Sequence, residues 1–433
     1  MNKYFWFLIY IIFISSTSVA DDDFEFEDEI EFDATEIFEE KSEKKSALFD
    51  HSHRLSLSYQ LGSTVDKSPE IRTNKFQVRY RWDKLLSNSL YAKVDAKIIG
   101  LGPEDTSVDS NKALDYDWRV NNMSLQWSHQ SIATTVGFQS IVMGELDSLP
   151  LNDLMTPWDY SQPAFTNPED ARVGQITLDT QWFQKKNRSI RFIFIPIPEV
   201  NRYPGSDLTQ LTPQLSNMKI NETLPYEQTA WEAAFTAKQS LDAIDINFLF
   251  AMLHTNDPVF TSISDNERNA TYPSFETTGL SINYNHENFL WKLEGNFQNN
   301  LPLSGTGNEI SDKISVGGGF DYDANGLYQL TFESSYTELL NPPTFQLGQS
   351  SSTTQSALRF SKDLMNELIN VVYFLSFNWK YNDQIHSAYA NYKMTDNWQV
   401  SLNASVFHIP DKKSPMNFAD SWDQVSLTIT ADF

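Results

Sequence analysis

Most of the sequence after His51 alternates between apolar and polar residues with a period of two. Successive residues of a β-strand point to opposite faces, so each alternating segment predicts a strand with one apolar and one polar face. The segment 75–82 shows the pattern. Its apolar face would contain Phe76, Val78, Tyr80 and Trp82, and its polar face Lys75, Gln77, Arg79 and Arg81. A chain of such strands must bury its apolar faces, either in a soluble protein core or against lipid.

Three features favour lipid. The connectors between the predicted strands alternate strictly between short and long. The chain ends on Phe433, and a terminal aromatic residue of this kind resembles the assembly signal of Gram-negative outer-membrane barrels. Aromatic residues also recur near the predicted strand ends, where the interfacial girdles of membrane barrels lie, at Tyr59, Trp82, Trp127, Trp182, Trp231, Trp291, Trp379, Trp398 and Trp422.

The alternation predicts 18 strands, with 16 as the next best number, and each is bounded by turn residues. Short turns at one end and mostly long loops at the other are typical of an even-stranded bacterial barrel with both termini in the periplasm. We therefore expect an all-β, transmembrane antiparallel barrel over residues 51–433, in the cell outer membrane. The predicted strands are 53–62, 73–83, 89–100, 114–127, 132–143, 172–183, 188–198, 227–239, 242–254, 274–285, 288–299, 313–322, 327–338, 353–362, 367–379, 384–393, 397–408 and 422–433.

The first 20 residues predict a secretory signal peptide. Lys3 precedes an apolar run over residues 4–14, and small residues end the segment at Ser18 and Ala20. The apolar run is too short for a membrane-spanning helix, which needs about 20 residues. The mature chain is therefore expected to be exported.

Residues 21–50 predict an acidic periplasmic tail. Residues 21–40 contain twelve carboxylates and no Lys or Arg, interleaved with Phe and Ile. A block this charged repels itself and should be disordered when free. The interleaved aromatic residues favour a segment that folds on a basic partner, such as a periplasmic or inner-membrane transporter bound through residues 21–45. A solvated tail without a partner is the alternative.

The polar faces of the predicted strands suggest a charged lumen. Rings of charge set the ion preference of pores, so a basic wall would favour anionic solutes. The opposite charges could instead pair and satisfy one another. The basic candidates are Lys75, Arg79, Arg81, Lys93, Lys97, Arg119 and Arg191; the later strands offer Glu232, Glu276, Glu294, Glu333 and Arg359.

Two long connectors, 144–171 and 199–226, could constrict the lumen, since loops of this length are uncommon unless functional. The first carries the candidate constriction residues Glu145, Asp147, Asp153, Trp158 and Asp159. The sequence leaves open whether the loops fold inward or cover the outer surface.

Residues around the first of these connectors carry a family resemblance. The run 136–144, Asp147, Asn152-Asp153, Pro157-Trp158-Asp159 and Asp170-Ala171-Arg172 resembles a signature of a proteobacterial outer-membrane β-barrel family of unknown function, similar in style to the alginate-export porins. Phe138 and Met143 depart from the pattern, which has a basic residue and Trp there. The resemblance implies a passive channel or an export conduit and supplies no substrate.

Enzymatic motifs are weak in comparison. The chain has no Cys, its seven His residues are scattered, and the Gly-x-Ser-x-Gly and His-Glu-x-x-His patterns do not occur. We expect no enzyme, cofactor or metal centre, and the net charge of −25 argues against nucleic acid. The expected function is a porin-like outer-membrane channel for small or anionic solutes. The first alternative is an export component for polysaccharide or hydrophobic cargo that works through the acidic tail. A structural or adhesive barrel with a closed lumen is the second alternative, and a surface enzyme is the third. Membrane lipid, lipopolysaccharide and the barrel assembly machinery are the expected partners.

Overall fold

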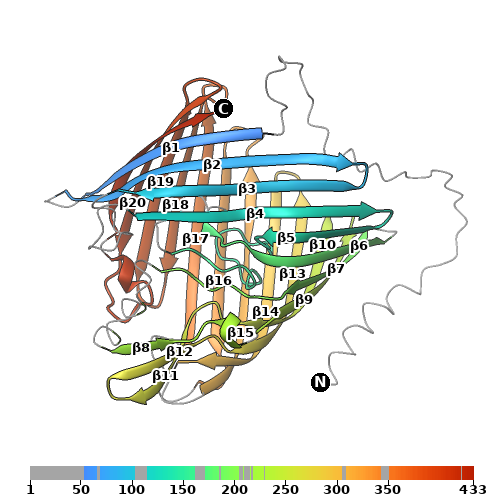
Figure 1. Cartoon of the computed structure of the whole chain (residues 1–433), viewed down its shortest axis with the longest axis vertical. Coiled ribbons are helices and arrows are strands. Elements are labelled where there is room, and N and C mark those ends of the chain that lie inside the picture. The colour runs from blue at the N-terminus through green and yellow to red at the C-terminus, as the bar shows by residue number, and fades with distance from the viewer. Residues whose placement is uncertain are drawn as a thin grey trace, which may run out of the picture. The chain divides into compact units, whose positions relative to one another are not determined.

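A computed structural model describes residues 53–65, 69–102, 115–160, 171–184, 187–203, 208, 215, 218–228, 230–304, 309–342, 351–420 and 422–433. The predicted signal peptide and acidic tail lie outside the described residues. From residue 49 onward the chain forms one compact unit, and it is this unit that carries the strands in Figure 1.

The unit is a closed, antiparallel, 18-stranded barrel, as predicted. The first strand, β1, pairs with β2 on one side and with the last strand, β21, on the other. Every predicted strand has a counterpart in the barrel. The barrel strands are β1 (His53–Thr64), β2 (Ile71–Ser87), β3 (Leu90–Leu101), β4 (Asp115–His129), β5 (Ile132–Gln139), β6 (Gln175–Gln184), β7 (Arg188–Ile195), β9 (Glu232–Leu241), β10 (Ile244–His254), β13 (Ser274–His286), β14 (Phe289–Leu303), β15 (Glu309–Asp323), β16 (Gln329–Leu339), β17 (Ser352–Leu364), β18 (Ile369–Asn378), β19 (Asp383–Lys393), β20 (Trp398–His408) and β21 (Gln424–Asp432).

The two ends of the barrel differ. At one end, which we call the turn end, consecutive strands are joined by tight hairpins whose residues take positive φ, as at Gln130, Asn187, Asp242 and Glu287. Such left-handed residues match the right-handed twist of the paired strands. The other end, the loop end, carries the long connectors. The predicted strict alternation of lengths is wrong there, because the loop-end connector 379–382 is as short as the turns.

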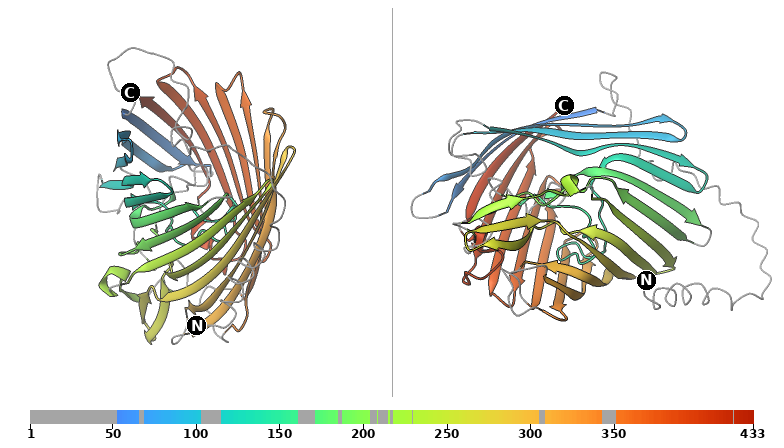
Figure 2. Two further views of the ribbon diagram at one scale, coloured as in Figure 1. Left: turned by 90° about the vertical axis from the view of Figure 1, so that its right-hand side faces the viewer. Right: turned by 60° about the horizontal axis from the view of Figure 1, so that its bottom comes forward.

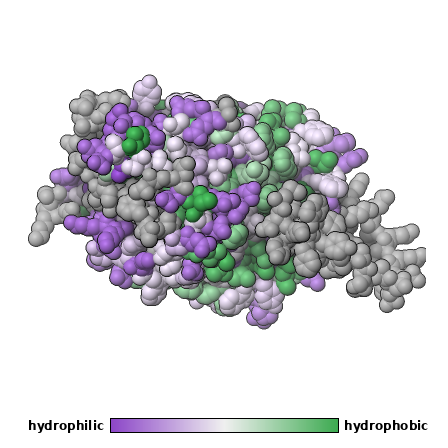
Figure 3. Space-filling view, turned by 90° about the horizontal axis from the view of Figure 1, so that it is seen from below, coloured by the Kyte–Doolittle hydropathy of each residue, from purple (hydrophilic) through white to green (hydrophobic). Residues whose placement is uncertain are grey.

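The outward side of the strands is apolar. Exposed Leu, Ile, Val, Phe, Tyr and Trp side chains recur at every second position, as at Leu55, Tyr59, Phe76 and Tyr80. Figure 3 shows one face of the molecule, on which hydrophobic residues gather over one half and hydrophilic residues over the other. An apolar exterior on a closed barrel is the surface that lipid covers, and the architecture is that of a cell outer-membrane protein. Among the described residues, no helix is long and apolar enough to cross a bilayer.

Three strands of the structure were not predicted. β8 (Lys219–Glu222), β11 (Val259–Ser264) and β12 (Glu267–Thr271) form a small sheet from two loop-end connectors, in which β8 and β12 pair in parallel. Its apolar core contains the buried residues Leu208, Leu215, Phe260 and Ala270. These strands lack the extended alternation of a membrane strand, so periodicity alone reads them as loop.

Candidate functional site

The connector between β5 and β6 folds into the barrel. Its residues 140–160, here called the inner loop, lie within the ring of strands in both views of Figure 2. They lie against the inward faces of β13, β14, β15 and β16, which we call the docking wall. The contacts that follow settle the choice left open by the sequence: this connector folds inward.

Glu294 of β14 is the central anchor of the inner loop. Its side chain points inward and is 0% exposed. Its carboxylate accepts backbone N–H groups of Leu146 (2.8 Å), Leu151 (3.0 Å) and Asn152 (3.2 Å), and also that of Glu145. One carboxylate therefore satisfies four main-chain donors of a segment without regular secondary structure, and such charge-assisted bonds are about twice as strong as neutral ones.

Glu333 of β16 repeats the arrangement beside it. It too is 0% exposed, and its carboxylate accepts the N–H groups of Asp147 (2.8 Å), Ser148 (2.8 Å) and Leu149 (2.9 Å). Successive N–H groups directed at one anion form an anion-binding concavity. In this protein the bound anions are two carboxylates of the barrel wall.

Polar side chains of the docking wall complete the attachment. The Lys292 ammonium, 5% exposed, pairs with Asp147 (2.5 Å) and Asp321 (2.7 Å). The amide of Asn283 donates to Glu145 (2.5 Å), and that of Asn296 donates to the Leu151 carbonyl. The buried charge of Lys292 is thus compensated from both the loop and the wall.

Two glycines allow the inner loop to pack closely against the docking wall. A Cβ at Gly317 of β15 would lie 3.0 Å from Leu146 Cδ1 and 3.1 Å from Leu151 Cδ1. Gly144 has a φ of +92°, and a Cβ there would lie 2.5 Å from the Glu294 carboxylate. The bare backbone of β15 and the left-handed residue at 144 allow the loop to approach the wall this closely.

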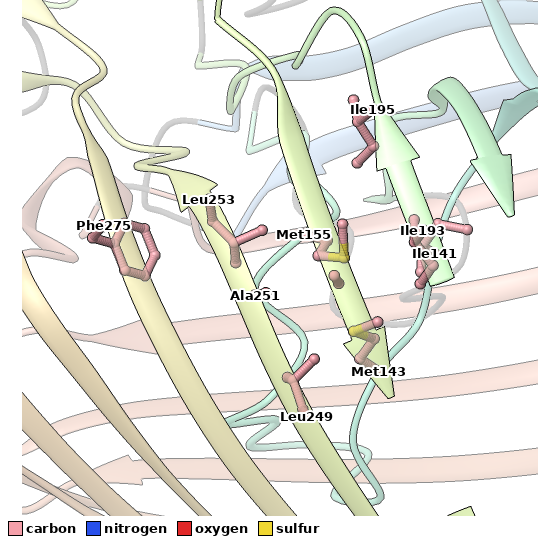
Figure 4. Packing of buried hydrophobic residues seen from close by; sticks show 10 residues of the cluster. Ile141, Met143, Met155, Ile193, Ile195, Leu249, Ala251, Leu253 and Phe275 are labelled. Carbon is pink, nitrogen blue, oxygen red and sulfur yellow. The ribbon is translucent and has the colours of Figure 1, made fainter. Parts of the chain in front are cut away.

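An apolar cluster holds the two ends of the inner loop. Ile141, Met143 and Met155 pack against inward-facing side chains of β7, β9, β10 and β13 (Figure 4). The wall residues of this cluster are Ile193, Ile195, Ala234, Leu249, Ala251, Leu253 and Phe275. Inward positions here are apolar because protein, and not water, covers them.

The last part of the inner loop bears three of the predicted constriction residues. Asp153 pairs with Arg172 (2.8 Å), whose guanidinium also lies 5.0 Å from the Trp158 ring centroid. Asp159 pairs with Arg119 of β4, so the loop is tied to the opposite wall as well. Burial raises the pKa of the Asp153 carboxyl, and the adjacent Arg172 charge opposes that rise.

A cavity of about 1090 Å³ remains between the inner loop and the uncovered walls. The inward faces of β2, β3 and β4, which we call the basic wall, bound one side, and β16 to β19 bound another. Four carboxylates line this cavity, and each has an ion-pair partner: Asp95 with Arg79, Asp147 with Lys292, Asp153 with Arg172, and Asp159 with Arg119.

Two cations of the cavity differ from the others. Lys93 of β3 and Arg359 of β17 line it, and neither has an ion-pair partner within the part of the chain that the structure describes. Apolar side chains flank Arg359 along the same wall, at Val372, Phe374 and Tyr389. The cavity therefore combines two cations that have no ion-pair partner among the described residues with an apolar surface.

The predicted lumen residues occupy three kinds of place. Arg79 and Arg191 are paired with neighbouring aspartates, Asp95 and Asp179, at 2.6 Å each. Other basic residues are also in polar contact: Arg81 donates to Ser56 (3.2 Å), Lys97 is buried, and Lys75 has a polar partner.

The predicted acidic lumen residues lie elsewhere. Glu294 and Glu333 lie beneath the inner loop, and Glu232 is buried where it accepts the N–H of His254 (2.8 Å). Glu276 is exposed on the outward face of β13.

Phe433 lies at the barrel seam. Its N–H donates to the Leu55 carbonyl (2.8 Å), and its carbonyl accepts from the Leu55 N–H (2.9 Å). Its side chain is 60% exposed. The last residue of the chain therefore continues the pairing that closes the barrel.

Several site residues were missed by the sequence analysis. Lys292, Asn283 and Asn296 were absent from the candidates because nothing in a polar strand face shows what covers it. Two signals were available: the Gly317-Gly318-Gly319 run and the strand run 248–253, which is apolar on both faces. Both mark inward surfaces that a packed segment covers.

No protein-family model matches this sequence. No curated protein sequence matches it either. Among solved structures, the chain is similar to OccAB1 of Acinetobacter baumannii (TM-score 0.52, 8% identity, 88% of this chain and 95% of that chain covered). It is equally similar to OpdK of Pseudomonas aeruginosa in a structure with vanillate (TM-score 0.52, 8% identity, 88% and 98% covered). At this identity the likeness shows a shared outer-membrane barrel fold. The alginate-export resemblance has no counterpart in these comparisons.

Proposed function

We propose that the chain is a porin-like channel that passes small anionic solutes across the outer membrane. The observation that supports the proposal is the pairing of the charges that line the cavity. Its four carboxylates are all paired, whereas Lys93 and Arg359 add positive charge without a paired counter-charge. Fixed charge that lines a narrow passage selects ions of the opposite sign.

The net charge of the whole chain does not oppose this proposal. Of the 57 acidic residues, twelve fall within residues 21–40, outside the described barrel. Charges separated by more than a Debye length of about 8 Å in physiological salt are largely screened, so the cavity side chains dominate what a permeating ion meets. The apolar residues beside Arg359 favour anions that also carry an apolar part.

Planar-bilayer recording in a KCl gradient tests the proposal. The parent channel should give a reversal potential of the anion-selective sign, and the double variant Lys93→Glu with Arg359→Glu should move it toward cation selectivity. Lys380→Glu is the matched control, because Lys380 is exposed in the loop-end connector 379–382. A cation-selective parent, or a double variant with unchanged selectivity, would contradict the proposal.

The export alternative and the proposed partners depend on residues 21–45, which lie outside the described residues. We propose, as the sequence suggests, that this segment binds a basic periplasmic surface. Pull-down of periplasmic and inner-membrane proteins with a 21–45 peptide tests it, and a peptide of the same composition in scrambled order is the control. Equal capture by the two peptides would count against a specific partner.

A further inference from the structure

A second segment lies beside the cavity. The connector between β20 and β21, residues 409–423, contributes Met416 and Trp422 to its lining. Trp158 and Tyr160 of the inner loop line the same cavity. Aromatic and apolar side chains from two different connectors therefore border one passage.

The described residues of the 409–423 segment, 409–420 with 422 and 423, form a folded element that packs on an apolar core. Its buried residues Ile409 and Ala419 pack with Ile385 and Phe407, which are register partners on β19 and β20. Met416 and Trp422 pack against this core. The Trp422 and Phe407 rings meet edge to face, with centroids 6.0 Å apart and planes at 81°.

Hydrogen bonds fix the backbone of the same segment. The buried Ser414 hydroxyl donates to Asp383 (2.5 Å), and Ser414 Oγ accepts the Met416 N–H (3.0 Å). A short 3-10 turn, η5 (Asn417–Ala419), follows, and the Trp422 N–H donates to the Ala419 carbonyl (2.9 Å). Met416 and Trp422 are thus held at the cavity by a defined local structure.

The strand faces beneath this segment have buried apolar residues at inward positions, as do those beneath the inner loop. Ile385 and Phe407 point inward, yet they are apolar and buried. Apolar residues on the inward face of a water-filled barrel are buried only where protein covers them. Residues 409–423 are that cover, which makes them a second inward-packed segment.

We infer that Met416 and Trp422 form a second lip of the constriction and help to determine which solutes pass it. The inference rests on the proposed channel function. The inner loop limits the passage from the docking wall, and residues 409–423 limit it from the wall formed by β19 and β20. Bulky solutes must pass Trp422 as well as the inner loop.

Single-channel recording and solute uptake into proteoliposomes test the inference. Met416→Ala with Trp422→Ala should raise the conductance and reduce the discrimination against larger anions in a graded series of carboxylates. Trp379→Ala is the matched control, because Trp379 is an exposed loop-end tryptophan on the outward face, and it should leave both quantities unchanged.

Loss of the lip must be distinguished from loss of the fold. Circular dichroism of each variant reports the barrel, and Trp422→Phe retains an aromatic contact with Phe407 while it shortens the side chain, so its conductance should lie between those of the parent and the double variant. Folded double-variant channels with parental conductance and discrimination would overturn the inference. A parent that conducts no ions would instead refute the proposed function.

Discussion

The docking wall and the basic wall have the same kind of strand sequence, but the inner loop covers the inward charges of the first and leaves those of the second at the cavity. Both alternate apolar outward residues with inward residues that are mostly polar or charged. On the docking wall, Glu294 and Glu333 are covered, and their carboxylates bind seven main-chain N–H groups in total. On the basic wall, Arg79 pairs with a neighbouring side chain, Asp95, and remains at the cavity.

The difference shows that charge on an inward strand face has two uses. A carboxylate opposite a glycine-rich strand can accept backbone donors, because a loop can approach it closely. The Arg79 guanidinium pairs instead with the neighbouring Asp95 side chain, and both side chains line the cavity. The first use shapes the passage, and the second sets its charge.

The largest effect is expected for Glu294→Ala. Four buried N–H groups lose their acceptor, and a lost hydrogen bond to a charged group costs about 1.5–3 kcal/mol, so the inner loop should leave the wall. We expect noisier single-channel conductance, because the released loop fluctuates in the lumen, and a destabilisation of about 3 kcal/mol or more in denaturant unfolding in micelles. Glu333→Ala should behave in the same way to a smaller degree.

Glu276→Ala is the control for this comparison, because Glu276 is exposed on the outward face. It should leave both the conductance and the unfolding midpoint close to those of the parent. If Glu294→Ala also matched the parent in both measurements, the proposed anchoring of the inner loop would be wrong.

A smaller effect is expected for Gly317→Val. The new side chain would occupy the space of Leu146 and Leu151, and overpacking of this kind costs about 1–3 kcal/mol. Unfolding in micelles should report that loss, and conductance should fall because the loop shifts toward the cavity and narrows it. Gly100→Ala is the control, since a Cβ there meets, among the described residues, only the Phe76 carbonyl oxygen within 4 Å, at 3.9 Å. Equal stability of the two variants would argue against close packing of loop and wall.

The smallest change in the shape of the passage is expected for Arg79→Ala. The side chains of Arg79 and Asp95 are 19% and 12% exposed, and removal of one partner of a largely buried ion pair is destabilising because the other charge is left uncompensated. The variant leaves Asp95 uncompensated in the cavity, so both the anion selectivity and the unfolding midpoint should fall. Arg191→Ala is the control, because Asp179, the ion-pair partner of Arg191, is not among the cavity-lining residues. A comparison of the reversal potentials of the two variants separates the electrostatic effect from a structural one. Identical reversal potentials in both would exclude a role of Arg79 in selectivity.

The sequence was sufficient for the strands because a membrane strand repeats one rule along its whole length. Lipid imposes an apolar residue at every second position, and each hairpin needs residues that tolerate positive φ, such as Asn187. The small sheet of β8, β11 and β12 escaped prediction because no lipid imposes that rule on a connector.

The site was only partly predictable. Asp147, Asp153, Trp158 and Asp159 were identified as constriction candidates, and all four line the cavity. Glu294 was expected as a lumen charge, and its burial beneath the inner loop could not be inferred, since the strand β14 looks the same with either an open or a covered inward face.

The sequence by itself determined the number of barrel strands, the identity of their outward faces and the end at which long connectors gather, because these follow from local periodicity and turn chemistry. Only the tertiary structure decided which connectors enter the barrel, which carboxylates they cover and which cations stay at the cavity. Those outcomes depend on contacts between residues far apart in the chain, such as Asn283 and Glu145, whose separation is 138, and Glu145 and Glu294, whose separation is 149. No local pattern encodes such contacts.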